Sequence, residues 1–195
     1  MVYVEVRCLD INPFLPVGID AGQMRFLDAF LLWCLLAPSA ADSPEESRAM
    51  QADQTAIVER GREPGLRLSG GDRDEWAAAI LEQCELAAEL LDRAQGGRRS
   101  SDAVRERRAL LQDPANTPSA KVLEAMRSGR QPFFRFALNQ SERHRRWFSE
   151  RPLSAAELAR HERRAARSFN EQRRIEAGSD ESFDEFLTAY LALPE

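Results

Sequence analysis

Glu5 and Arg7 are the residues near the N-terminus whose types and spacing could do chemistry. They lie in residues 2–8 (VYVEVRC), where apolar and polar positions alternate as in a β-strand. Side chains two positions apart on a strand share a face, with Cα atoms about 6 to 7 Å apart. The carboxylate could bind a hard cation such as Mg²⁺, and the guanidinium could bind phosphate oxygens. The spacing alone favours an ordinary solvated ion pair.

The predicted strand over residues 2–8 needs neighbouring strands, because one strand cannot satisfy its own backbone donors and acceptors. No other segment of the sequence has a convincing strand pattern. We therefore expect this strand to belong to an antiparallel sheet whose other strands precede Met1 or come from another chain. The chain is accordingly expected to be a C-terminal portion, with residues 1–19 forming a strand and loop and residues 20–195 a helical region.

The remaining sequence predicts helices, so the expected fold class is α+β and mostly α-helical. Apolar residues recur every three or four positions, and Asp20, Ser43, Ser154 and Ser182 have the chemistry of helix N-caps. Core candidates are Trp33 and the stripe Trp76, Ile80, Cys84, Ala87 and Leu91. The expected helices cover approximately residues 20–36, 43–61, 74–95, 102–112, 119–127, 132–149, 154–177 and 182 to the C-terminal end.

Composition excludes several classes of protein. The chain has 195 residues, of which 43% are hydrophobic and 30% charged, which is typical of a compact domain and not of a disordered tail. The longest apolar run, residues 26–37, contains Asp28 and is too short for a membrane span. The residues after Met1 lack a signal-peptide pattern, so we expect a cytoplasmic protein. The three cysteines, Cys8, Cys34 and Cys84, are expected to be small buried hydrophobes.

An arginine-rich segment permits a different function. Residues 143–174 contain ten arginines and four glutamates, although the whole chain has a net charge of -5. Trp147 and Phe148 lie within it and could stack on bases, or could simply pack inward. His144 and His161 have no partners at metal-ligand spacing. The alternative hypothesis is therefore a noncatalytic helical module that binds nucleic acid or an acidic partner through this segment.

Three longer stretches carry a resemblance to a known family. They are YVEVRCLDINPFLPVGI (residues 3–19), QMRFLDAFLLWC (residues 23–34) and GREPGL (residues 61–66). In these the chain closely resembles the proteobacterial glutamate–cysteine ligases. A looser likeness continues to FDEFL at residues 183–187. The resemblance makes nucleic acid an unexpected partner, because the alternative leaves the first 35 residues unexplained.

The resemblance implies an ATP-dependent ligase that joins the γ-carboxylate of L-glutamate to the amine of L-cysteine through γ-glutamyl phosphate. It implies a glutamine-synthetase-like antiparallel sheet, with Mg²⁺ bridging carboxylates and ATP phosphates. Glu5 would then be a metal ligand, and Arg7 a catalytic, phosphate-binding residue. Tyr3 and Val4 would lie near the nucleotide, with Arg62 as a further candidate. The other ligands would come from an N-terminal remainder, so the isolated chain is expected to be incomplete.

Overall fold

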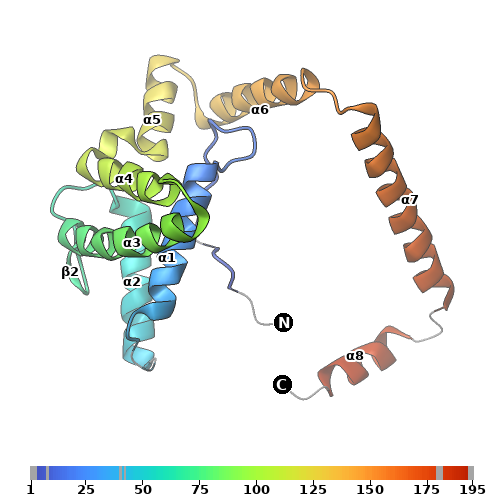
Figure 1. The fold of residues 1–195 in the computed structure, drawn as a ribbon, viewed down its shortest axis with the longest axis horizontal. Coiled ribbons are helices and arrows are strands. Elements are labelled where there is room, and N and C mark those ends of the chain that lie inside the picture. Colours follow the sequence, from blue (N-terminus) through green and yellow to red (C-terminus); the bar gives the residue numbers. More distant parts are fainter. Residues whose placement is uncertain (1–3, 8, 40, 42, 179–181, 193–195) are drawn as a thin grey trace. The chain divides into compact units, whose positions relative to one another are not determined.

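The computed structural model describes residues 4–7, 9–39, 41, 43–178 and 182–192. It divides the chain into two compact units, Met1–Arg145 and Arg146–Glu195. The ribbon is drawn in Figure 1. The prediction of a mostly α-helical chain is confirmed. No helix in the described ranges is long and apolar enough to cross a membrane.

The first two helices of the first unit begin at the predicted caps. The Asp20 carboxylate accepts from the Gln23 amide at 2.7 Å, and Ser43 Oγ accepts from the Glu46 amide at 3.1 Å. Such side-chain acceptors satisfy amides that have no partner within the helix. The helices are α1 (Ala21–Leu36), α2 (Pro44–Arg60), α3 (Arg73–Gln95), α4 (Arg99–Gln112), α5 (Pro118–Ser128) and the start of α6 (Phe133–Ser149), with a 3₁₀ turn at Pro114–Asn116.

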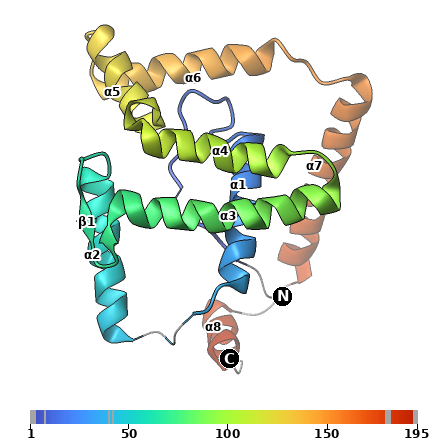
Figure 2. The ribbon, with the colours of Figure 1, turned by 60° about the vertical axis from the view of Figure 1, so that its left-hand side comes forward.

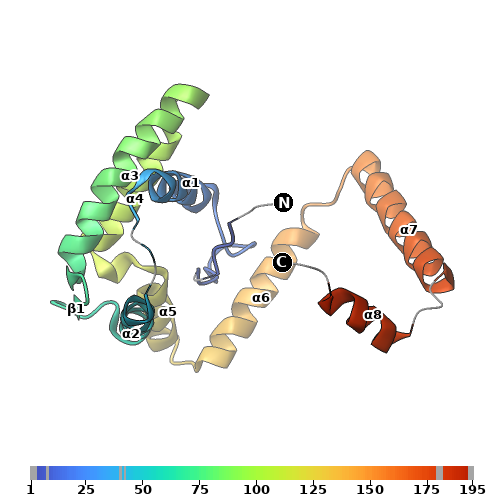
Figure 3. The ribbon, with the colours of Figure 1, turned by 90° about the horizontal axis from the view of Figure 1, so that it is seen from below.

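The core of the first unit lies between α1, α3 and α4. Figure 2 shows α3 and α4 side by side, and Figure 3 shows α1 lying against both. The buried cluster consists of Ala29, Leu81, Cys84, Ala88 and Val104. Small residues dominate it, so the helix backbones can approach closely. Larger partly buried side chains surround this cluster, namely Phe26, Phe30, Trp33, Ile80, Leu91 and Leu111.

Two predictions about this core are wrong. Trp76 is 42% exposed, because it lies at the first turn of α3, beside Gly70 and away from the α1–α3–α4 cluster. Cys34 is exposed near the end of α1, whereas Cys84 is buried as expected. Cys8 lies outside the described residues. Periodicity therefore identified the apolar positions of each helix, but not which of them contact another helix.

Helix α4 begins at Arg99, three residues before its predicted start. The Asp92 carboxylate, from the end of α3, accepts from the amides of Ser100 at 2.8 Å and Ser101 at 3.0 Å and from Ser101 Oγ at 2.6 Å. It thus caps the following helix from outside it. Burial raises the pKa of Asp92, but these hydrogen bonds outweigh burial and lower it to about 2.

The described sheet is a short hairpin that the sequence pattern did not predict. Strands β1 (Arg67–Leu68) and β2 (Gly71–Asp72) pair antiparallel, with Arg67 opposite Asp72 and Leu68 opposite Gly71. The predicted strand over residues 2–8 is absent from its described residues 4–7. No other described segment pairs with them, and a strand without a partner has no ladder of hydrogen bonds. The larger sheet expected around this segment stays a prediction.

The second unit contains α7 (Ala155–Gly178) and α8 (Phe183–Leu191). Ser154 and Ser182 cap them as predicted, because each serine Oγ accepts from the amide of the glutamate three residues later. The amide of each serine in turn donates to the carboxylate of that glutamate. None of the described residues of this unit is buried. Local capping therefore defines these helices more than packing does.

Candidate functional site

Arg7 and Arg62, both candidates through the family resemblance, line one surface pocket of about 930 Å³. The N-terminal segment contributes Arg7, Leu9 and Asp10 to the wall of this pocket. The opposite part of the wall is the end of α2 with the turn after it, and Ser119 of α5 also contributes. We call this the Arg7–Arg62 pocket. Two arginines from distant parts of the sequence therefore line the same pocket.

The side chains of Glu5 and Arg7 meet in an ion pair. Arg7 Nη2 donates to Glu5 Oε2 at 2.8 Å, and both side chains are exposed. The structure thus shows the solvated pair that the spacing permitted. An exposed pair of this kind is worth little in stability, so a ligand can separate the two groups at small cost.

A closed turn fixes the residues that follow this pair. The Asn12 amide donates to the Gly18 carbonyl at 2.9 Å, and the Gly18 amide donates to the Leu15 carbonyl at 3.0 Å. Gly18 has φ +76°, and a Cβ there would lie 2.6 Å from Ile11 Cγ2. The Phe14 ring meets the buried Phe136 ring of α6 edge-on, with centroids 5.7 Å apart. The turn is therefore anchored on the helical unit.

Arg62 lies in a turn that follows the end of α2. The Gly61 amide donates to the Ile57 carbonyl at 2.9 Å, and the Glu63 amide donates to the Arg60 carbonyl at 2.7 Å. Within the part of the chain that the structure describes, the Arg62 side chain has no hydrogen-bond or ion-pair partner. It is exposed and available to an anion.

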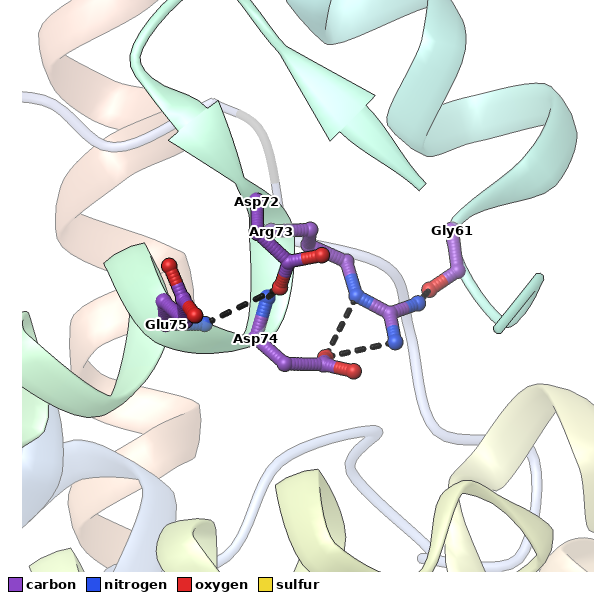
Figure 4. Close-up of polar contacts among 5 residues, drawn as sticks. All are labelled: Gly61, Asp72, Arg73, Asp74 and Glu75. Carbon is purple, nitrogen blue, oxygen red and sulfur yellow. Dashed lines mark hydrogen bonds and ion pairs between the residues drawn. The ribbon is translucent and has the colours of Figure 1, made fainter. Parts of the chain in front are cut away.

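Arg73 was missed by sequence reasoning, although it is the buried arginine nearest this turn. Figure 4 shows its guanidinium between the Gly61 carbonyl and the Asp74 carboxylate. Arg73 is only 8% exposed. Arg62 and Arg73 also line a second, mostly apolar pocket of about 340 Å³, with Phe26 and Phe30 in its wall. The dipeptide Arg73–Asp74 at the start of a helix does not by itself indicate that the arginine contacts the end of α2.

The other predicted site residues are not brought into this pocket. Val4 is exposed and Glu5 is not part of the pocket wall. Tyr3 lies outside the described residues. The described residues contain no group of three or more His, Cys, Asp or Glu side chains that could hold a metal ion. Glu5 has the carboxylate chemistry of a Mg²⁺ ligand, but it would supply one ligand and not a complete site.

Comparisons with known proteins agree on one family. Residues 1–57 match the family model described as glutamate–cysteine ligase. Over 194 residues the chain is 46% identical to the glutamate–cysteine ligase of Pseudomonas paraeruginosa and 43% identical to that of Pseudomonas fluorescens. These matches cover 97% of this chain but only 37% and 36% of those relatives.

A solved structure shows the same likeness in three dimensions. A crystal structure of glutamate–cysteine ligase from Francisella tularensis in complex with AMP superposes with a TM-score of 0.84 and 27% sequence identity. The match covers 95% of this chain and 37% of that one. The resemblance predicted from residues 3–66 is thus confirmed in sequence and in fold: the chain is similar to glutamate–cysteine ligases over a stretch of little more than a third of their length.

Proposed function

We propose that this chain is part of an ATP-dependent glutamate–cysteine ligase and contributes the Arg7–Arg62 pocket to its active site. The observation that carries the proposal is that Arg7 and Arg62 line the same pocket. Both residues lie in the stretches whose sequence resembles the family. Because the chain spans about 37% of its relatives, the remaining part of the enzyme would supply the rest of the site.

The proposed reaction has two steps. The γ-carboxylate of L-glutamate attacks the γ-phosphorus of ATP, which forms γ-glutamyl phosphate and releases ADP. The amine of L-cysteine then attacks the acyl carbon, loses a proton and displaces inorganic phosphate. No side-chain nucleophile is needed, so catalysis would consist of positioning and charge stabilisation.

Arg7 would bind the phosphoryl group during its transfer. A guanidinium can donate two parallel hydrogen bonds to phosphate oxygens and stays charged at any physiological pH. Arg62 would bind phosphate oxygens from the other wall of the pocket. Tyr3 and Val4 would lie near the nucleotide. The Francisella tularensis ligase was solved in complex with AMP, which supports a nucleotide as a ligand of the whole enzyme.

Glu5 would supply one oxygen ligand to Mg²⁺. Mg²⁺ prefers oxygen ligands and is usually bound through one or two carboxylates together with substrate phosphates and water. When bound, it would neutralise negative charge on the ATP phosphates. The Glu5–Arg7 ion pair would open, so that the carboxylate turns to the metal and the guanidinium to the phosphate. We also propose a cytoplasmic location, in keeping with a reaction that consumes ATP.

Reconstitution tests this proposal. ADP release that depends on glutamate, cysteine and Mg²⁺ is measured for this chain alone. It is then measured after mixing with the part of the Pseudomonas paraeruginosa ligase that this chain does not match. We expect turnover only in the mixture. No turnover in a mixture shown to associate would contradict a ligase function, and turnover by the chain alone would contradict its incompleteness.

The alternative of a noncatalytic nucleic-acid-binding module has weaker support. The curated relatives match 97% of the chain, a span that includes the arginine-rich residues 143–174. The module hypothesis predicts salt-dependent retention on a polyanion column that is lost in the double variant Arg163→Glu and Arg164→Glu. The ligase proposal predicts that this variant keeps its turnover in the mixture.

A further inference from the structure

We infer that Arg73 is a positioning residue that holds the loop carrying Arg62, an inference that rests on the proposed function of Arg62. The loop runs from Gly61, at the end of α2, to Asp72, just before α3. Arg73 is the first residue of α3. It does not line the Arg7–Arg62 pocket, so it would act through Arg62.

Arg73 donates hydrogen bonds to the backbone of this loop at two positions. Its guanidinium Nη1 donates to the Gly61 carbonyl, directly before Arg62. Its backbone amide donates to the Leu66 carbonyl at 2.9 Å, after the turn. Arg73 therefore contacts the first and the last residue of the GREPGL segment. Figure 4 shows the side-chain half of this arrangement.

The guanidinium is itself held in place. Nε donates to Asp74 Oδ1 at 2.7 Å, and Nη2 lies 2.5 Å from the same oxygen. The Asp72 carboxylate accepts from the amides of Asp74 at 2.9 Å and Glu75 at 3.2 Å, which fixes the first turn of α3. The planar fork of arginine suits two acceptors at fixed angles, and lysine offers no such fork.

The rest of the loop has separate anchors. The Ser69 amide donates to Asp53 Oδ1 at 2.9 Å, and Leu66 is only 2% exposed. Loss of the Arg73 side chain should therefore free residues 61–65 while the hairpin stays in place. Arg62 has no side-chain partner among the described residues, so its position depends on this backbone. A displacement of about 1 Å at a reacting group can cost about 100-fold in rate.

Hydrogen exchange of the chain alone tests the loop without any turnover. We expect Arg73→Met to speed exchange of the amides in residues 61–65 and to leave those of α3 and α4 unchanged. The matched control is Arg108→Met. It removes an ion pair of 2.9 Å between Arg108 and Glu85 of α3, and it does not change the loop. Unchanged exchange at residues 61–65 would overturn the inference.

A double-mutant cycle in the reconstituted ligase tests the link to Arg62. We expect Arg73→Met to lower kcat/KM for ATP by about 10- to 100-fold, Arg73→Lys to lower it less, and Arg108→Met to leave it unchanged. In an Arg62→Ala background, Arg73→Met should have little further effect, because two residues that act as one unit are not additive. Circular dichroism checks that each variant keeps its helix content.

The outcomes separate the two proposals. An equal loss from Arg73→Met with and without Arg62 would show a merely structural role and overturn the inference, while leaving the ligase function intact. Full activity of Arg62→Ala would remove the role of Arg62 itself, and the positioning inference with it. A reconstituted mixture without turnover would contradict the ligase proposal independently of the exchange result at the loop.

Discussion

The two units of this chain contain similar helices but stabilise them differently. In the first unit, α1, α3 and α4 enclose a buried cluster that includes Leu81 and Val104. In the second unit, α7 and α8 have N-terminal serine caps, yet none of the described residues is buried. Both units show helical periodicity in the sequence. Periodicity and capping thus define a helix, whereas tertiary packing decides whether it has a core of its own.

The sharpest test of this contrast truncates one leucine in each unit. Leu81 is 7% exposed and Leu158 is 49% exposed. Leu81→Ala should lower the free energy of unfolding by about 2–5 kcal/mol, because it leaves a cavity. Leu158→Ala should change it by less than about 0.5 kcal/mol. Urea unfolding followed by circular dichroism measures both, and similar costs would show that the second unit has an equivalent core.

Cysteine reactivity tests how well the first unit shields its interior. Burial, followed by the nearby Cys34 thiolate, raises the pKa of Cys84 to about 11. Cys34 is exposed, although partial burial also raises its pKa. At pH 8 we expect alkylation of Cys34 at least about 100-fold faster than that of Cys84, since the thiolate is the reactive form. Peptide mass analysis measures the two rates, and equal rates in the folded chain would contradict a closed core.

Asp92 joins two helices of the core through one carboxylate. Asp92→Ala should cost about 1–2 kcal/mol, as expected for a lost N-cap, and Asp92→Asn should cost less because its amide oxygen can still accept. The pKa of Asp92 is lowered to about 2 from an ordinary value of 3.8, so the folded state favours the carboxylate. Its contribution should be complete above about pH 4 and disappear as the pH falls to about 2.

That loss is visible as a difference in acid unfolding. The wild-type chain should lose stability between pH 4 and pH 2 by more than Asp92→Ala does. Equal slopes in this interval would show that the carboxylate has no special role in holding α4.

The smallest expected effects are those of exposed ion pairs, which should be alike in both units. Glu45–Arg48 on α2 and Glu171–Arg174 on α7 have the same three-residue spacing, with contacts of 2.6 Å and 2.5 Å. Glu45→Gln and Glu171→Gln should each change the free energy of unfolding by at most about 0.5 kcal/mol. A clearly larger effect in either unit would show that its pair is part of a wider network.

Sequence reasoning predicted the helices better than the connections between them. The N-caps at Asp20, Ser43 and Ser182 are local signals, and the structure has all three. The early start of α4 was not predictable locally, because its cap, Asp92, belongs to the preceding helix. The hairpin at residues 67–72 is too short to show an alternating pattern.

The site was predictable only in part. The family resemblance singled out Arg7 and Arg62, and the structure places both at one pocket. The spacing of Glu5 and Arg7 predicted that their side chains lie together, and they form an ion pair. The predicted strand is absent, because no described segment pairs with residues 4–7. Arg73 carries no local signal, because its contact with Gly61 depends on how the loop folds back toward α2.

Turnover of an Arg7 variant tests whether Arg7 binds the transferred phosphoryl group. Arg7→Ala is assayed in the reconstituted ligase beside Arg105→Ala, which also removes an exposed arginine from a 2.8 Å ion pair but does not line the Arg7–Arg62 pocket. We predict at least about a 100-fold loss of kcat for Arg7→Ala, as for other groups that stabilise transition-state charge, and no loss for Arg105→Ala. Wild-type turnover by Arg7→Ala, with unchanged helix content and association, would contradict a role for Arg7 in phosphoryl transfer.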